Sequence, residues 1–267
     1  MNPGTISGAE AAFSAQAPRF DVIDDGNPII GRMRTIVRRA VMRNYAPGQE
    51  LLELNAGTGL DALWFAERGL NVLATDAAPG MVARLRERSA RFPERVLAVE
   101  ECSFNELERL GARRFDHVFS NFGGLNCTAR LDKVLHDIDG LLRPGGTCAL
   151  VIMPRFSPWE TLALLKGNLR LAYRRWRRSG TPAKVEDIPF TCYYYSPRYV
   201  RRELGNDYDV LLQRTLSWFI PPPHLENFPS RWPRSYDALQ RLEDATAAYW
   251  PFNIGGDHFL IVLRKRS

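Results

Sequence analysis

The residues best suited to chemistry are two glycines and a carboxylate near the start of the chain. Gly57 and Gly59 follow the apolar run 51–54, and Asp76 ends a second apolar run, 71–76. Glycines at such a turn let the backbone approach a ligand closely, and a helix that begins there offers free N–H groups. The carboxylate of Asp76 can accept hydrogen bonds from both hydroxyls of a ribose. The spacing therefore predicts a site for a ligand that contains a nucleoside.

The glycine spacing distinguishes two kinds of ligand. A dinucleotide fingerprint has the pattern G-x-G-x-x-G, in which the third glycine admits the diphosphate. In this chain Asn55 and Leu60 stand at the first and third positions, and only Gly57 and Gly59 remain. The pattern favours a ligand with a ribose but no phosphate. A glycine turn that binds no ligand is the structural alternative.

The segments around these residues alternate between strand and helix patterns. Strands are predicted at 51–54, 71–76, 95–99, 115–120, 147–153 and 208–219, with a final antiparallel strand at 258–263. Amphipathic or short helices are predicted between them, including 28–44, 131–142, 155–178 (as one or two helices), 197–204 and 234–249. Strands that alternate with helices indicate an α/β, doubly wound, mostly parallel sheet of seven strands.

Four motifs in this order resemble the class I S-adenosylmethionine-dependent methyltransferases of the small-molecule type. They are the glycine turn, the acidic end of the second strand, the strand Phe115-Asp116-His117-Val118, and the turn Arg143-Pro144-Gly145-Gly146 before the fifth strand. The resemblance covers about residues 28–153. It implies a Rossmann-like methyltransferase fold with S-adenosylmethionine as cofactor and S-adenosylhomocysteine as product. Asn55 departs from a family glycine, and Ser103 departs from a frequent family aspartate.

The same resemblance implies a set of cofactor-binding residues. Those near the methionine part and the methyl group are Glu53, Asn55, Ala56, Gly57, Thr58, Gly59, Asn121 and Phe122, and those near the ribose and adenine are Asp76, Ala77, Met81, Ser103 and Phe104. Turn formation or helix capping is the structural alternative for each polar residue.

Two residues are candidates for catalysis because they belong to the same edge of the predicted sheet. Methyl transfer requires a nucleophile that is held close, aligned and dry, and a base is needed only where the nucleophile retains its proton. His258 begins the last strand, and Glu160 follows the fifth. Their structural alternatives are a strand-end histidine bonded to Asp257 or to backbone, and a first-turn carboxylate favoured by the helix dipole. Because adjacent strand residues point to opposite faces, a direct pair of His258 and Asp257 is not expected.

We expect one methyltransferase domain over residues 1–267. Its parts are a cofactor-binding core at 20–153, a substrate cap at 154–256 that holds strand six and the helical and aromatic inserts, and the final strand at 257–267. Residues 1–19 are rich in alanine, glycine, serine and proline and are expected to form a mobile tail that can fold over a ligand. The acceptor-binding candidates are Tyr193, Tyr195, Trp218 and Asn126, and packing is the alternative for the tyrosines.

The charge and composition of the chain indicate which kinds of binding partner to expect. The net charge is +6, but the excess is concentrated in the arginines of 170–178, which form a solvated face or meet an anionic substrate or membrane surface. The run 120–123 (Ser-Asn-Phe-Gly) lacks the asparagine-proline-proline-aromatic signature of many nucleic-acid methyltransferases, so nucleic acid is disfavoured. The four cysteines show no metal-ligand spacing and indicate a reduced, cytoplasmic protein without a metal. No apolar run reaches transmembrane length, so an integral membrane protein is not expected.

These features predict S-adenosylmethionine-dependent methyl transfer to a small molecule. Aromatic-rich inserts suggest an apolar or aromatic specialised metabolite and a role in biosynthesis. Two alternatives stay open. One is a non-catalytic partner subunit that binds S-adenosylmethionine, and the other is a methyltransferase of lipid-like or diphosphate-bearing substrates at a membrane surface.

Overall fold

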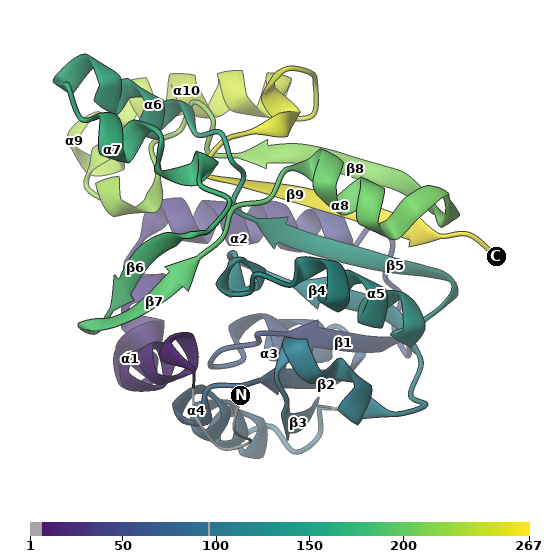
Figure 1. Ribbon diagram of the computed structural model, residues 1–267. Coiled ribbons are helices and arrows are strands. Elements are labelled where there is room, and N and C mark those ends of the chain that lie inside the picture. Colours follow the sequence, from purple (N-terminus) through teal and green to yellow (C-terminus); the bar gives the residue numbers. More distant parts are fainter. Residues whose placement is uncertain (1–6, 96) are drawn as a thin grey trace.

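One mixed sheet organises the computed structural model, which describes residues 7–95 and 97–267 (Figure 1). In the described residues this sheet has seven strands in the order β3-β2-β1-β4-β5-β9-β8. The strands are β1 (Glu50–Leu54), β2 (Asn71–Asp76), β3 (Leu97–Glu101), β4 (Phe115–Ser120), β5 (Leu142–Ile152), β8 (Tyr208–Leu216) and β9 (His258–Lys265). Among these strands only β9 runs opposite to the common direction of the others, and it pairs in antiparallel fashion with β5 and β8. The predicted doubly wound sheet with an antiparallel last strand is therefore confirmed.

The strand order reverses between β1 and β4. These two strands pair in parallel, with Leu54 opposite Ser120 at their carboxyl ends, whereas the chain reaches β4 only after β2 and β3. The connections on either side of such a reversal leave the sheet in opposite directions, which opens a crevice above the carboxyl ends. The loops that begin at residues 55 and 121 border this crevice.

Helices cover both faces of the sheet. The longer ones are α1 (Gly8–Asp25), α2 (Pro28–Val41), α3 (Leu60–Ala66), α4 (Pro79–Ala90), α5 (Leu131–Leu141), α8 (Pro197–Leu204) and α10 (Pro233–Thr246). Short helices are α6 (Pro158–Thr161), α7 (Leu169–Ala172) and α9 (Phe228–Arg231), with 3₁₀ turns η1 (Phe104–Leu110), η2 (Gly124–Cys127), η3 (Leu162–Lys166), η4 (Arg174–Trp176), η5 (Gly205–Asp207), η6 (Pro223–Leu225) and η7 (Phe252–Ile254). In the described residues no helix is long and apolar enough to span a membrane.

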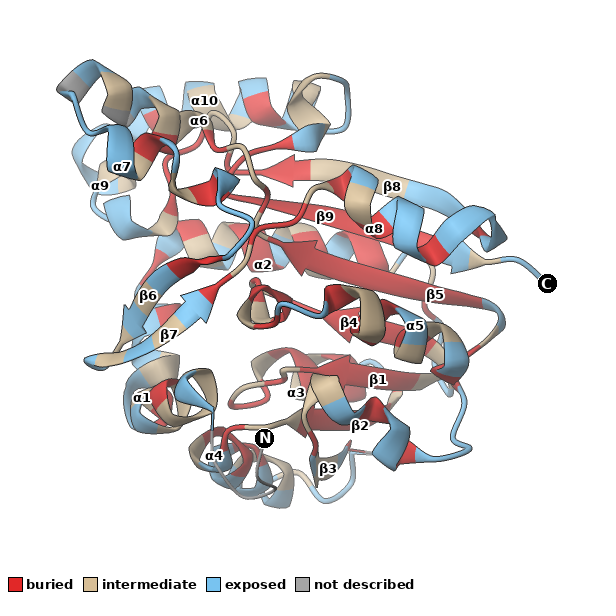
Figure 2. Cartoon of the chain, viewed as in Figure 1, coloured by how far each residue is buried: buried red, intermediate tan, exposed pale blue. Residues whose placement is uncertain are grey.

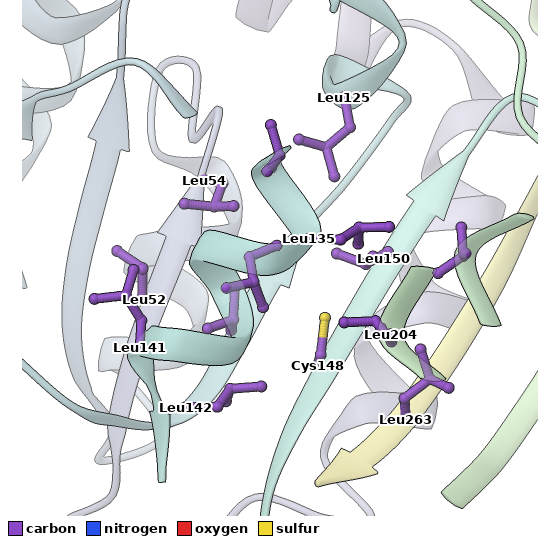
Figure 3. Packing of buried hydrophobic residues seen from close by; sticks show 14 of the residues in the cluster. Leu52, Leu54, Leu125, Leu135, Leu141, Leu142, Cys148, Leu150, Leu204 and Leu263 are labelled. Atoms are coloured by element: carbon purple, nitrogen blue, oxygen red, sulfur yellow. The ribbon is translucent and has the colours of Figure 1, made fainter. Parts of the chain in front are cut away.

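The central strands are buried on both faces, so their sequences are continuous apolar runs (Figure 2). Leu52 and Leu54 of β1 join a cluster with α5, whereas Leu51 joins the cluster on the opposite face with α2 and α3. Figure 3 shows the first cluster, where Leu135, Leu150 and other side chains from several elements fill one space. The alternation of these leucines fixes the register of β1 between two helix layers.

The N-terminal segment is a helix, so the predicted mobile tail at 1–19 is wrong for the residues that the structure describes; residues 1–6 lie outside them. Helix α1 begins with a capping box, in which Glu10 N–H donates to Ser7 Oγ (3.3 Å) and Ser7 N–H donates to Glu10 Oε2 (2.8 Å). These bonds satisfy two of the N–H groups that have no partner within the helix.

The insert after β5 also differs from its prediction. The helical pattern at 155–178 is divided into α6, η3, α7 and η4, with Gly167 at a φ of +71° between η3 and α7. A separate hairpin follows, formed by β6 (Thr181–Val185) and β7 (Ile188–Cys192). Its turn residues Glu186 and Asp187 both have positive φ, as a two-residue hairpin turn of type I′ requires. The third strand lies at Leu97–Glu101 rather than 95–99, a range whose residue 96 is outside the described residues.

Candidate functional site

A cavity lies at the carboxyl edge of the sheet, above the segments that follow β1, β2, β3 and β4. Nine predicted cofactor-binding residues line it: Asn55, Gly57, Asp76, Ala77, Met81, Ser103, Phe104, Asn121 and Phe122. The other described lining residues are Ser7, Ala9, Glu10, Phe13, Phe20, Ala78, Asn105, Gly124 and Cys127. The structure thus brings the segments that follow four strands and helix α1 around one space.

The carboxylate of Asp76 is held by backbone groups at the wall of this cavity. Gly57 N–H donates to Oδ2 (2.8 Å), and Ala78 N–H donates to Oδ1 (2.9 Å). Burial raises the pKa of Asp76 above its ordinary value, although these N–H bonds favour the charged form. Each carboxylate oxygen still has acceptor capacity for a ligand hydroxyl.

The two glycines of the turn have different roles. Gly57 has a φ of +59°, and a Cβ there would contact only the Phe20 ring, at 3.8 Å, so its backbone is open to the cavity. Gly59 has a φ of +84°, and a Cβ there would lie 2.2 Å from Leu85 Cδ1 of α4. Gly59 therefore permits the packing of the turn on α4, and because it is not among the described lining residues, its predicted contact with the cofactor finds no support in this geometry.

Asn55 explains how the turn tolerates a side chain where the family has glycine. Its φ is +46°, a region that asparagine adopts more readily than most residues. Ser120 Oγ donates to Asn55 Oδ1 (2.6 Å), and Asn55 Nδ2 donates to the Asn121 carbonyl (3.0 Å). The side chain thereby joins the loop after β1 to the loop after β4.

Below the cavity, a buried network of charges fixes these loops to α2. Asp61 accepts hydrogen bonds from Arg34, from Arg38 Nε (2.6 Å) and from Asn121 Nδ2 (2.8 Å). Glu53 is 2% exposed, and burial raises its pKa well above the ordinary value, with the negative Asp61 adding to the effect. Glu53 does not line the cavity; among the described groups its Oε2 atom has no hydrogen-bond partner.

Two other predicted cofactor-binding residues also lie outside the cavity lining. Ala56 is buried and its N–H donates to the Thr75 carbonyl (2.9 Å). Thr58 donates through Oγ1 to Asp21 of α1. Both residues shape the turn from behind, so their predicted contact with a cofactor finds no support in this geometry.

Helix α1 closes one side of the cavity, where the sequence predicted a segment that can fold over a ligand but not a helix. Ala9, Glu10, Phe13 and Phe20 of α1 are lining residues. The helix is tied to α4, because Gly80 N–H donates to Ser14 Oγ (3.0 Å) and Arg88 forms an ion pair with Asp21. The motif Ser7-Gly8-Ala9-Glu10 was the available signal, because it has the spacing of a capping box. Figure 1 shows α1 beside the β6–β7 hairpin, and the Phe13 and Phe190 rings lie 5.8 Å apart.

His258 lies next to the loop after β4 but does not line the cavity. Its ring meets Phe122 edge-on at 6.3 Å between centroids, and its Nε2 is 3.2 Å from the position of a Cβ on Gly123. Its Nδ1 lies 2.9 Å from Asp257 Oδ2, so the expectation that these two residues do not pair is wrong. Asp257 precedes β9, and Gly256 has a φ of +108°, so the alternation of a regular strand does not apply there.

Arg175 connects this histidine to the second catalytic candidate. The buried guanidinium donates to Asp257 Oδ1 (3.1 Å), to the Asp257 carbonyl (2.9 Å) and to Glu160 Oε1 (2.8 Å). Burial opposes ionisation of Asp257, but His258 and Arg175 lower its pKa well below the ordinary range. Asp257 is therefore a fixed negative charge beside the imidazole.

Glu160 is engaged by two arginines and does not reach the cavity. Arg174 donates to both of its oxygens (2.7 and 2.6 Å), and Arg175 shares one of them. Burial alone would raise the pKa of Glu160, but these guanidinium groups lower it below the ordinary value. A carboxylate held in this way is a weak base, so the geometry gives no support to a catalytic Glu160.

The predicted acceptor-binding residues occupy packing positions. Asn126 is fully buried and donates to the carbonyls of Met153 (3.1 Å) and Tyr193 (2.5 Å). Tyr195 donates to the Thr128 carbonyl, and Trp218 packs on the rings of Phe156 and Phe252. Tyr193 packs against the cluster around α5. None of these four residues is among the described lining of the cavity.

Comparison with known proteins agrees with this geometry. Residues 52–150 match the family model of the methyltransferase domain. Demethylmenaquinone methyltransferase of Renibacterium salmoninarum is 30% identical over 156 residues, which cover 57% of this chain and 62% of the relative. A protein of Talaromyces variabilis described as an S-adenosyl-L-methionine-dependent Diels-Alderase is 30% identical over 110 residues, which cover 40% of this chain and 37% of the relative. The chain spans about half the length of the curated relatives it matches.

The whole fold has a counterpart among solved structures. The CcbJ methyltransferase from Streptomyces caelestis superposes with a TM-score of 0.60 at 18% identity, over 97% of this chain and 99% of that one. The sheet order, the crevice and this likeness define a class I methyltransferase fold. Residues 52–150 thus match the methyltransferase domain, and the chain is similar to S-adenosylmethionine-dependent methyltransferases.

Proposed function

We propose that this protein binds S-adenosylmethionine in the cavity and transfers its methyl group to a small molecule. The observation that supports this most directly is the Asp76 carboxylate, held by the Gly57 and Ala78 N–H groups at the wall of a crevice at the topological switch point. A carboxylate in this place suits a ribose, and the side chains of Ala77, Met81 and Phe104 offer apolar surface for a base.

The charge of the cavity favours a cationic ligand over a phosphate-bearing one. Glu10 and Asp76 are both lining residues, and no lysine or arginine is among the described lining residues. A diphosphate would meet two carboxylates without a basic partner, which costs electrostatic energy, whereas a sulfonium would be attracted. The residues present therefore fit S-adenosylmethionine, which would supply an electrophilic methyl group.

The chain itself would position the acceptor and handle its proton. With Nδ1–H donating to Asp257, the Nε2 atom of His258 is an acceptor that can take a proton from a hydroxyl or an ammonium. We assign the acceptor to the side of the β4 loop that His258 borders, with residues 154–256 as its cap. Supporting this, the insert leaves the carboxyl end of β5, and its hairpin packs on α1.

Calorimetry with S-adenosylhomocysteine tests the cofactor assignment. Wild type should bind, and Asp76→Ala should weaken binding by about 1–3 kcal/mol, the cost of losing hydrogen bonds to a charged group. Asp209→Ala, which removes an exposed carboxylate on β8, is the matched control and should bind as wild type does. If wild type binds neither S-adenosylmethionine nor S-adenosylhomocysteine, the proposal is wrong.

A second function is a domain that binds S-adenosylmethionine without transferring a methyl group. The relative described as a Diels-Alderase is the observation that favours it. Methyl-labelled S-adenosylmethionine and a panel of aromatic hydroxy and amino compounds distinguish the two. Label in a product supports methyl transfer, whereas tight binding with no labelled product across the panel supports the alternative.

A further inference from the structure

The segment 162–178 exposes apolar side chains at a spacing that normally marks a buried stripe. Leu162, Leu165, Leu169, Tyr173 and Trp176 follow one another at intervals of three or four residues. Their exposed fractions are 51%, 85%, 62%, 56% and 58%. We call residues 162–178 the tip segment, and Figure 1 shows its helix α7 projecting at the upper left of the molecule, away from the sheet. So much exposed apolar surface in one short segment indicates a binding surface.

The tip segment contains several basic residues and no acidic ones. The sequence contains no aspartate or glutamate between Glu160 and Glu186. Arg170, Arg177 and Arg178 are exposed, and none of them forms an ion pair with any described residue. The partner of this surface must therefore be both apolar and anionic.

The two remaining arginines of the segment have the opposite role. Arg174 and Arg175 both bind Glu160, and Arg175 also binds Asp257 at the start of β9. These bonds fix the tip segment to the body of the protein at its base. The exposed residues are thus presented on a support that is anchored by buried ion pairs.

We propose that the tip segment docks on an anionic lipid surface. Leucine side chains can enter the boundary of the acyl chains, tryptophan and tyrosine suit the headgroup level, and arginine binds phosphate. Three arginines that form no ion pair with a described residue match the negative potential of such a surface. This docking does not depend on the proposed methyl transfer. If the protein transfers methyl groups, docking would give it access to an apolar acceptor in the bilayer.

Co-sedimentation of the full chain with lipid vesicles tests the proposal. The vesicles are phosphatidylcholine alone or phosphatidylcholine with about a third phosphatidylglycerol, at low and high salt. Wild type should bind the anionic vesicles, bind them less at high salt, and not bind the neutral ones.

Matched variants assign the contact to the tip segment. A triple change of Arg170, Arg177 and Arg178 to Gln should weaken binding about a hundred-fold, since each arginine near such a surface is worth about five-fold. A triple change of Leu165, Leu169 and Trp176 to Ser should weaken it at least ten-fold. The control is a triple change of Arg114, Arg198 and Arg201, exposed arginines elsewhere, to Gln, and it should bind much as wild type does.

Several outcomes would overturn the proposal. Wild type that ignores anionic vesicles, or tip variants that bind them as well as wild type does, would exclude lipid docking. Sedimentation that shows a dimer lost in the tip variants, without vesicle binding, would assign the surface to a second copy of the chain. All variants should bind S-adenosylhomocysteine equally, so failure of the lipid proposal and failure of the cofactor proposal are distinguishable.

Discussion

At Gly80 the backbone of α1 packs closely against α4. An added Cβ at this position would lie 2.5 Å from the Ser14 carbonyl oxygen and 2.9 Å from Ser14 Cα. Both are backbone atoms of α1 and have no rotamer by which to move aside. We therefore expect Gly80→Ala to push α1 away from α4.

The size of the effect follows from these contacts. The shortest is about 1 Å below ordinary van der Waals separation, and overpacking of this kind costs about 1–3 kcal/mol. The hydrogen bond from Gly80 N–H to Ser14 Oγ contributes about 1 kcal/mol more if it is lost. The better helix propensity of alanine offsets up to about 1 kcal/mol. The net cost to α1 docking is about 1–3 kcal/mol.

Because α1 supplies lining residues, that cost should appear in ligand affinity. We expect Gly80→Ala to weaken S-adenosylhomocysteine binding about 5- to 150-fold in calorimetry and to speed hydrogen exchange of the α1 amides. Gly140→Ala is the matched control, since this α5 glycine has open space around it. Equal affinity and equal α1 protection in the two variants would refute the closure of the cavity by α1.

Three further predictions test the site and its support. Gly57→Val should abolish cofactor binding, because valine is strained at a φ of +59° and its branches would enter the cavity; a folded variant with normal calorimetry would place the ligand elsewhere. His258→Ala should lower kcat roughly 10²–10⁴-fold at unchanged cofactor affinity if it is a base, with exposed His136→Ala as control, whereas a loss confined to KM would indicate positioning. Burial lowers the pKa of His117 to about 4, so the unfolded chain binds its proton more readily. The unfolding free energy should therefore fall by about 3 kcal/mol as pH drops from about 6.5 to 4, and His117→Gln should lose that dependence in denaturant titrations.

The sheet and the lining of its crevice could be predicted because parallel βα units place their chemistry at fixed points of the sequence. Each strand is a continuous apolar run, and the residues directly after it, such as Gly57, Ala77 and Asn121, reach the carboxyl edge. The same rule identified residues that lie near the cavity but face away from it. Thr58 and Gly59 follow the strand too, but the αL conformation of the turn directs them to α1 and α4.

Helix α1 could not be recognised from periodicity. Many of its residues are small, and one face covers the cavity instead of a core, so no regular apolar stripe forms. The helix is held by single polar contacts, such as Ser14 with Gly80 and Asp21 with Arg88, whose partners are 66 and 67 residues away. Pairings at that separation leave no local pattern in the sequence.

The arginine run 170–178 is a second case in which contacts between distant residues leave no local pattern in the sequence. One cluster of basic residues contains two kinds of arginine: Arg175 is 3% exposed and fixed by Glu160 and Asp257, whereas Arg177 is exposed. The sequence pattern does not distinguish these arginines, because the carboxylates that bind Arg175 lie 15 and 82 residues away from it in the chain. The anchoring arginine ties the base of the tip segment to the aspartate that pairs with His258. The tip segment and the imidazole are therefore joined by one chain of hydrogen bonds, through Arg175 and Asp257.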